Sequence, residues 1–574
     1  MDQTLIPSHN QETDTHKMPS KDKSIFCPYL LDTLKSYTGH QFYKDVIAGI
    51  IVSIVALPLA IAFGIASGVS PQVGVVTAIV GGFIVSLLGG SKVQIGGPTG
   101  AFIIIVYGIV QKYGLDGLII STFLAGVMLL LMGVARFGSV IKFIPFPVIV
   151  GFTSGIAVII FSSQLKDLLG LPLGDLPAGF AGKWAIYFKS WSQLNLYSLA
   201  IGSITIVIIS FWSKLTHKVP GSLVAIVATT LLVHLVDIPV ETVESRFGNI
   251  SGGTFNLKLP NLDPDTIGKL FAPAFTIALL GAIESLLSAV VADGMTGGSH
   301  RSNTELIAQG IANIGSSVLG GIPVTGAIAR TATNIKNGGR TPIAGIIHAL
   351  SLLLMLLFVG KWVILIPMAT LAGILVVVAY HMSEWENFLT VLKGPTSDII
   401  VLLTTFILTV AIDLTVAIEV GMVLAAFLFM QKMIKVSKVR LLEGDDRDTA
   451  IEISYKSEID KKMQIFELHG PLFFGAAYKF KDAMKLVAVP PKVLILRLRD
   501  VPIIDVTGIQ AIQELNRTSK ERGTKLILTE ISSEQVMKEL RKSRVVFQVG
   551  KANIVDNFQN AVKRAHIIIE EYHI

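Results

Sequence analysis

The stretch Gly96-Gly97-Pro98-Thr99-Gly100-Ala101 begins one apolar run of the chain, and Gly320-Gly321-Ile322-Pro323-Val324-Thr325-Gly326-Ala327 begins another run much later. Both contain a Gly-Gly pair, a proline and a Thr-Gly-Ala sequence in the same order. Because glycine and proline interrupt helices, each stretch predicts a broken entry into an apolar helix. The repetition predicts a chain built from two related halves.

The surroundings of both stretches are apolar. Of the 574 residues, 51% are hydrophobic and 16% are charged, whereas about 25% of the residues of a soluble protein are charged. Apolar runs follow one another from Val46 to Ile434, and about fourteen of them could cross roughly 30 Å of hydrocarbon. We therefore predict an α-helical polytopic membrane protein. The expected segments start near Val46, Val73, Thr99, Asp116, Pro145, Leu196, Val219, Phe271, Thr304, Pro323, Pro342, Trp362, Thr396 and Leu414.

Basic residues predict the orientation of these segments. Lys44, Lys92, Arg136 and Lys336 stand at ends of apolar runs that share one side if the N-terminus is cytoplasmic. The acidic stretch 237–269 then lies outside and divides the segments into seven and seven. An odd number of spans in each half predicts an inverted repeat. We expect a multi-pass protein of the plasma (inner) membrane with both termini in the cytoplasm.

A helix that begins within the membrane has unpaired N–H groups and a positive dipole end, which together bind anions. Two such helices from opposite halves would point at each other. We predict an anion between the first turns at Thr99-Gly100-Ala101 and Gly326-Ala327-Ile328, with Pro98 and Pro323 setting the helix starts. The alternative is that both stretches are ordinary glycine- and proline-containing loops without a binding function.

Charged and polar residues stand near these turns. Arg330 follows Gly326 by one helical turn, and it either faces the same cavity or anchors the cytoplasmic end of its helix. Glu284 lies near the middle of the run 271–293, where a charge is unfavourable unless it is paired or faces a cavity. Ser288 is one turn further on. Glu284 could carry a proton together with an anion, bind sodium, or form structural hydrogen bonds.

Several functional classes fit the sequence poorly. The net charge is +7, but the basic residues do not form aromatic-interleaved stripes, so we expect no nucleic-acid partner. Cys27 is the only cysteine, which excludes a disulfide or cysteine metal site within one chain. We see no Walker loop, metal cluster or catalytic triad, and we expect neither an enzyme nor a cofactor.

The chain changes character after Lys435. Strand-like stretches at 463–467, 493–498 and 525–529 and a helical stretch at 509–522 predict a compact α/β domain. The expected boundaries are a cytoplasmic tail at 1–45, a transmembrane transport domain at 46–434, a linker at 435–460 and the α/β domain at 461–574.

Three motifs in the membrane region strongly resemble the sulfate permease (SulP) family. They are residues 94–101, the sequence Glu284-Ser285-Leu286-Leu287-Ser288, and residues 320–331. The resemblance covers nearly the whole chain except the N-terminal tail. It implies a fourteen-span fold, shared with nucleobase transporters, in which a core domain that holds the anion moves against a gate domain. It also implies that Glu284 is the coupling position and that the pocket is lined by Thr99, Ser288, Gly326, Ala327 and Ile328.

Two departures from one branch of this family bear on the substrate. In the sodium-coupled bicarbonate branch the coupling position is Asp, where this chain has Glu284, and the position of Arg330 is uncharged. We therefore favour proton-coupled uptake of sulfate or a similar anion, with a homodimer as the expected assembly. The alternatives are sodium-coupled bicarbonate or C4-dicarboxylate transport, an uncoupled chloride carrier, and a nucleobase–proton symporter of the same fold.

The C-terminal domain resembles a STAS domain. The resemblance rests on residues 470–475, after the first main strand, and on Asp505-Val506-Thr507-Gly508 at a helix start. In signalling relatives a hydroxyl in that loop is phosphorylated. Thr507 either keeps this regulatory role or caps the helix beside Asp505, and we favour the cap.

Overall fold

The protein is described by a computed structural model. The structure describes residues 25–139, 144–174, 176–177, 179–215, 219–248, 263–412, 414–442, 462–485 and 490–571. The chain forms two compact units, residues 1–423 and residues 424–574, which we describe one at a time.

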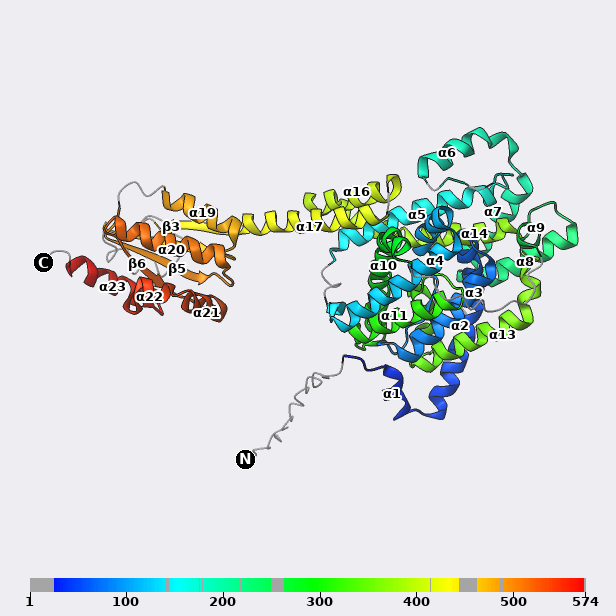
Figure 1. The fold of residues 1–574 in the computed structure, drawn as a ribbon, viewed down its shortest axis with the longest axis horizontal. Coiled ribbons are helices and arrows are strands. Elements are labelled where there is room, and N and C mark those ends of the chain that lie inside the picture. The colour runs from blue at the N-terminus through cyan, green and yellow to red at the C-terminus, as the bar shows by residue number, and fades with distance from the viewer. Residues whose placement is uncertain are drawn as a thin grey trace, which may run out of the picture. The chain divides into compact units, whose positions relative to one another are not determined.

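The first unit is helical (Figure 1). Among the described residues, seven helices are long and apolar enough to cross a membrane, and four shorter helices are also apolar. Each of the expected apolar segments contains a helix, whereas the count of fourteen membrane crossings stays a prediction. The helices are α1 Tyr29–Leu34, α2 Gly39–Ala66, α3 Pro71–Leu88, α4 Phe102–Val134, α5 Phe146–Leu168, α6 Phe180–Lys189, α7 Leu196–Leu215, α8 Gly221–Val236, α9 Val243–Phe247, α10 Pro264–Thr296, α11 Ser302–Val318, α12 Ile328–Lys336, α13 Pro342–Val363, α14 Met368–Met382, α15 Trp385–Leu392, α16 Thr396–Ala411 and α17 Leu414–Val436.

The helices of this unit pack in two groups. In one group α4 packs on α10 and α11, and α2 and α3 pack on α13. In the other group α5 packs on α14 and α16, and α7 packs on α8 and α14. Each group combines helices from both halves of the sequence.

Small residues allow the closest of these contacts. Gly126 of α4 faces Gly310 of α11, and a Cβ atom at residue 126 would lie 2.8 Å from the carbonyl oxygen of Gly310. Without a side chain at either position the two backbones approach closely, as is common between membrane helices. This contact holds α4 against α11, on the C-terminal side of the broken entry of α4.

The helix α4 contains an internal break. Two segments were expected here, starting near Thr99 and Asp116, and they form one continuous element with non-helical geometry at Gly114 (φ 70°, ψ −172°). Glycine adopts this conformation without a steric penalty. The two expected segments are thus two helices that meet at residue 114.

The second unit contains a five-stranded sheet in the order β3-β4-β5-β6-β7, in which β3 is antiparallel to β4 and the other pairs are parallel. Alternate residues of the strands face opposite layers: Ile465 and Ile495 pack on α23, while Phe466 and Leu496 pack with the cluster that includes α20 and α21. The expected small α/β fold is confirmed. Its elements are β3 Lys438–Leu442, β4 Met463–His469, α19 Phe474–Lys485, β5 Val493–Asp500, α20 Val506–Glu521, β6 Lys525–Thr529, α21 Glu534–Lys542, α22 Val545–Val549, β7 Ile554–Val555 and α23 Phe558–Glu571.

Two element bounds differ from the expected domain boundaries. The strand β3 lies in the stretch expected to be a linker, so the sheet begins earlier in the chain than we expected. Similarly, α2 begins at Gly39, within the stretch 1–45 expected to be a tail. Strand pairing between β3 and β4 is a long-range contact, which the local sequence of a short charged strand does not indicate.

Candidate anion-binding site

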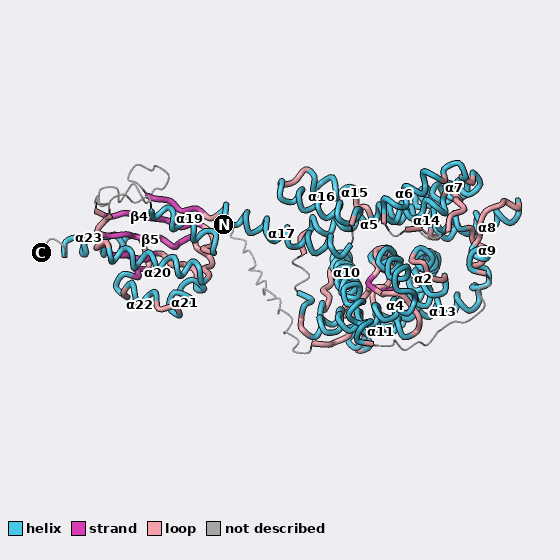
Figure 2. The backbone as a smooth tube through the Cα atoms, turned by 45° about the horizontal axis from the view of Figure 1, so that its top comes forward, coloured by secondary structure: helices cyan, strands magenta, loops and turns pink. Residues whose placement is uncertain are grey.

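The two glycine-rich breaks meet inside the first unit. Residues Gly96–Gly97 form β1 and Thr325–Gly326 form β2, and the two strands are antiparallel, with Gly96 opposite Gly326 and Gly97 opposite Thr325. Figure 2 shows this short pair in magenta among the helices. The two halves of the chain are therefore joined at their matching motifs.

The helices start later than the prolines suggested. The helix α4 begins at Phe102 and α12 at Ile328. Pro98 follows β1 and Pro323 precedes β2, so neither proline occupies the first turn of a helix. The expectation that these prolines set the helix starts is wrong, because the residues beside them are extended and pair across the two halves.

Several backbone N–H groups at these starts are free to bind an anion. In the described backbone, the N–H groups of Gly100, Ala101 and Ile328 make no hydrogen bond, and that of Ala327 donates to the carbonyl oxygen of Ile95 at 2.8 Å. The free groups stand at the positive ends of the dipoles of α4 and α12. Of the six residues expected to face an anion, Gly100, Ala101 and Ile328 thus have available amides, whereas the amide of Ala327 holds the strand pair together.

Glu284 lies beside the start of α4. The hydroxyl Oγ1 of Thr99 donates a hydrogen bond to Oε2 of Glu284 at 2.8 Å. Glu284 is half-buried near the middle of α10, which packs on α4 and α12. A carboxyl group and the free amides therefore lie at the same helix start.

Ser288 and Arg330 lie on the inner side of this region. The hydroxyl of Ser288 donates to Oγ1 of Thr331 at 3.3 Å, and both side chains are buried. Arg330 is only 2% exposed, and its Nη2 donates to the carbonyl oxygen of Pro98 at 3.1 Å. A Cβ atom at Gly97 would lie 2.5 Å from Nη1 of Arg330. The guanidinium thus packs against the backbone of residues 97 and 98. It places a positive charge next to the strand pair.

Residues of the other helix group cover the start of α4. A Cβ atom at Gly100 would lie 2.9 Å from Sδ of Met382 and 3.5 Å from Cδ1 of Ile160. Met382 ends α14 and Ile160 belongs to α5, both in the second group. The candidate site therefore lies where the two helix groups meet.

Sequence reasoning missed a second acidic residue close to this site. Glu305 of α11 is fully buried and accepts hydrogen bonds from the backbone N–H of Gly90 at 2.9 Å, from Gln94 at 3.0 Å and from Ser285 at 3.1 Å. Ser285 is the neighbour of Glu284, so Glu305 connects α10 to the residues that precede β1. Acidic residues are common in the first turn of a helix, where they interact favourably with the helix dipole. The sequence alone therefore gave no reason to place Glu305 at the site.

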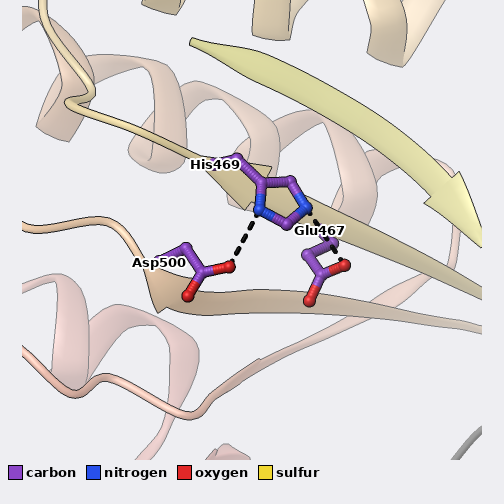
Figure 3. A group of neighbouring side chains, drawn as sticks. All are labelled: Glu467, His469 and Asp500. Atoms are coloured by element: carbon purple, nitrogen blue, oxygen red, sulfur yellow. Dashed lines mark ion pairs between the residues drawn. The ribbon is translucent and has the colours of Figure 1, made fainter. Parts of the chain in front are cut away.

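The second unit contains a group of side chains whose types could bind a metal. His469 lies between two carboxylates, with Nε2 at 3.2 Å from Glu467 and Nδ1 at 2.9 Å from Asp500 (Figure 3). Glu467 also pairs with Arg497 at 3.3 Å. A metal would use one ring nitrogen of His469 and would face the Arg497 cation. Both ring nitrogens of His469 thus already face carboxylates, those of Glu467 and Asp500.

Thr507 does not cap α20. The cap is Asp505, whose Oδ1 accepts from the N–H of Gly508 at 2.8 Å, and Thr507 stands in the first turn. The expectation of a Thr507 cap is wrong because the extended residue before the helix is Asp505. A regulatory role of Thr507 stays a proposal.

Comparison with known proteins identifies relatives of both units. The profile of the Sulfate permease family matches residues 42–405, and that of the STAS domain matches residues 454–563. The putative sulfate transporter YvdB of Bacillus subtilis is 39% identical over 526 residues, which are 91% of this chain and 98% of that protein.

Solved structures agree with the fold. The transmembrane domain of a cyanobacterium bicarbonate transporter, BicA, is 30% identical with a TM-score of 0.61, over 68% of this chain and 98% of that one. The murine anion transporter Slc26a9 in the inward-facing state has a TM-score of 0.83 at 17% identity, over 99% of this chain and 100% of that one, and shows the fold alone. The expected helical transmembrane fold with a C-terminal STAS domain is confirmed.

Proposed function

Because this chain belongs to the sulfate permease family, we propose that it is a secondary active transporter that takes up sulfate or a similar small anion together with protons. The observation that carries the proposal is the antiparallel pairing of Gly96–Gly97 with Thr325–Gly326. This pairing joins the backbone just before α4 to the backbone just before α12, which supports a shared site for the free amides at the two helix starts.

The anion binds to backbone groups in this proposal. The N–H groups of Gly100, Ala101 and Ile328 donate to it, and the two helix dipoles add attraction. Arg330 contributes charge without direct contact, since its guanidinium lies behind Pro98. Backbone donors suit a small oxyanion of any identity, so selectivity has to come from the size and the charge of the site.

Glu284 couples the anion to a proton. An anion about 4 Å from an ionised carboxylate would be repelled by about 4 kcal/mol at an effective dielectric constant of about 20, which weakens binding roughly a thousandfold. Protonation of Glu284 removes this repulsion, and the hydroxyl of Thr99 then stabilises whichever form is present. The proton and the anion therefore bind together and are released together.

Transport requires that the site opens to each side in turn. The group containing α4, α10 and α12 carries the amides and Glu284, while α5 and α14 of the other group cover Gly100 through Ile160 and Met382. Movement of one group against the other would uncover the site. In this proposal the two groups act as the core and gate domains that the family resemblance implies.

Sodium-coupled bicarbonate transport is the second candidate, and the similarity to the bicarbonate transporter BicA favours bicarbonate as its substrate. Glu284 Oε2 and Thr99 Oγ1, at 2.8 Å from each other, are both oxygen atoms that could bind a cation. A sodium ion beside Glu284 would also neutralise the carboxylate. The same site thus fits either coupling ion.

Uptake into proteoliposomes tests the proposal. The purified full chain is reconstituted, the membrane potential is clamped, and accumulation of labelled sulfate, bicarbonate and uracil is measured under an inward proton or sodium gradient. We expect the proton gradient to drive sulfate above its equilibrium level. Accumulation that follows only the sodium gradient would favour the second candidate, and uptake of uracil alone would indicate a nucleobase symporter.

The variant Glu284→Gln tests the coupling role. We expect it to exchange sulfate across the membrane but to lose proton-driven accumulation, because the amide is neutral and does not titrate. Glu386→Gln, which removes an exposed carboxylate of α15, is the matched control and should accumulate sulfate like the wild type. Full proton-driven accumulation by Glu284→Gln would refute the proton-carrier role.

A further inference from the structure

The first unit contains a cavity of about 890 Å³ between α4, α5, α6 and α10. Residues Thr99, Glu284 and Arg330 do not line it, so it is separate from the candidate site. Its wall includes Ile103 in the first turn of α4 and Ile159 of α5, which places its inner end next to the covered site. The charged residues of its wall are Lys112, Lys166, Asp167, Lys183, Arg246, Lys269 and Glu419.

Lys183 differs from the other cations of this wall because it is buried. Lys183 of α6 is 4% exposed, whereas Lys112 and Lys269 lie exposed to solvent. Arg246 is held in ion pairs with two carboxylates, and Lys166 donates a hydrogen bond to a backbone carbonyl. Lys183 is thus the cation of the wall that combines burial with the lack of a carboxylate partner, among the residues that the structure describes.

A tyrosine ring fixes the position of Lys183. Its Nζ lies 5.4 Å from the centroid of the Tyr107 ring. The hydroxyl of Tyr107 donates to the carbonyl oxygen of Leu176 at 2.9 Å, and a Cβ atom at Gly68 would lie 3.2 Å from the Tyr107 ring. Burial lowers the pKa of the Lys183 ammonium.

A buried ammonium without a counter-charge is unfavourable, and a cation–π contact offsets only part of the cost. The missing partner has to be negatively charged and small enough to enter a cavity that the protein leaves open beside Lys183. We propose that Lys183, positioned by Tyr107, forms a second anion-binding site, where a small inorganic oxyanion binds before it reaches the amides of α4 and α12.

The place of this site in the transport path rests on the proposed function, whereas anion binding at Lys183 does not. A single ammonium gives a weak site with little selectivity between sulfate and bicarbonate. Such a site raises the local anion concentration at the entrance, as charged clefts do for other substrates. Its loss should therefore weaken the apparent affinity for the anion and leave the turnover at saturation unchanged.

Chemical labelling of lysines tests binding directly. The full chain in nanodiscs is treated with a membrane-impermeant amine-reactive ester, and the extent of labelling at each lysine is followed by mass spectrometry at constant ionic strength. Sulfate or bicarbonate replaces gluconate in parallel samples. We expect at least one of the two anions to slow the labelling of Lys183 threefold or more. Lys189 is the control, since it is exposed on the same helix and should react at an unchanged rate.

Transport by variants tests the position of the site in the path. We expect Lys183→Gln to raise the KM for anion uptake fivefold or more at unchanged kcat. Lys183→Arg should restore most of the affinity, and Lys189→Gln should match the wild type. A purely structural role of Lys183 would lower kcat and thermal stability in both Lys183 variants.

The outcomes separate this inference from the proposed function. If neither sulfate nor bicarbonate slows labelling of Lys183, or if Lys189 is slowed equally, the second site is refuted even when the protein transports sulfate. If labelling is slowed selectively at Lys183, the site stands even when the wild type shows no proton-driven uptake.

Discussion

The hydrogen bond between Thr99 and Glu284 joins the two halves of the chain at the candidate site. Thr99 precedes α4 in the first half, and Glu284 belongs to α10 in the second half. Removing the donor leaves a half-buried carboxyl group without this partner. The hydroxyl therefore matters both for the anion site and for the group proposed to carry the proton.

Thr99→Val removes this hydroxyl while keeping the shape of the side chain. Loss of a hydrogen bond to this half-buried acidic group costs about 1–3 kcal/mol, which corresponds to a roughly 5- to 150-fold loss in anion uptake at low concentration. Thr99→Ser keeps the hydroxyl and should retain most of the activity. Initial uptake rates as a function of sulfate concentration measure both variants. If Thr99→Ser were as impaired as Thr99→Val, the lost methyl contact and not the hydrogen bond would be the cause.

At the scale of single elements, the break at Gly114 separates two helices, which the sequence predicted as separate segments starting near Thr99 and Asp116. A Cβ atom at residue 114 meets nothing within 4 Å, so the requirement for glycine is conformational. Its φ of 70° is a value that residues with a side chain rarely adopt.

Gly114→Ala should therefore lower the free energy of unfolding by about 1 kcal/mol or more. Gly108→Ala is the matched control, because residue 108 lies in the same element with helical geometry and also has open space at its Cβ position. That variant should be neutral or stabilising by up to about 1 kcal/mol. Thermal unfolding of the purified variants compares them, and equal stability of the two would mean that residue 114 is not restrained in solution.

The short helix α1 is held against the turn before α11 by Arg301. Its Nη2 donates to Asp32 at 2.8 Å, and its guanidinium lies 4.3 Å from the centroid of the Tyr29 ring. The hydrogen bond from Arg301 lowers the pKa of Asp32 below the ordinary aspartate value of 3.8. The contribution of this pair is complete above that value and is lost as the pH falls through the lowered pKa.

Hydrogen exchange measures how firmly α1 is held. In Asp32→Asn we expect the amides of residues 29–35 to exchange at most about fivefold faster at neutral pH, because a partly exposed ion pair at the surface contributes about 1 kcal/mol or less. The amides of α11 serve as the internal control and should not change. In the wild type, protection of α1 should be constant between pH 5 and 8. Protection of α1 that falls within this range would show that another group controls the docking.

The elements also show how far local sequence determines this fold. Apolar runs and Gly-Pro breaks indicated the helices and the broken entries of α4 and α12, because these depend on neighbouring residues. The β1–β2 pair, the hydrogen bonds of Glu305 and the packing of Arg330 on Pro98 depend on residues far apart in the chain. Helical spacing showed that Arg330 follows Gly326 by one turn, but it did not show on which side of the strand pair the guanidinium lies.

At the scale of the whole molecule, the chain divides into two units with separate hydrophobic cores. The sheet of the second unit has Ile465 and Ile495 on one face and Phe466 and Leu496 on the other, so helices cover both faces. Its strand β3 follows directly after α17 and pairs with β4 over five residues. The STAS unit therefore includes residues that lie between the two stretches matched by the family profiles.

Two fragments of the second unit test where it begins. A fragment of residues 437–571 contains β3, whereas a fragment of residues 462–571 leaves the edge of β4 unpaired. Loss of the β3–β4 pairing should cost about 1–3 kcal/mol and lower the melting temperature by roughly 5–15 °C, with a greater tendency to aggregate. Val439→Pro in the longer fragment should reproduce this loss, since proline disrupts strand pairing, while Arg440→Ala, at an exposed position of β3, should not. If both fragments melted at the same temperature, β3 would contribute nothing to the unit, and the expected boundary at residue 461 would describe it better.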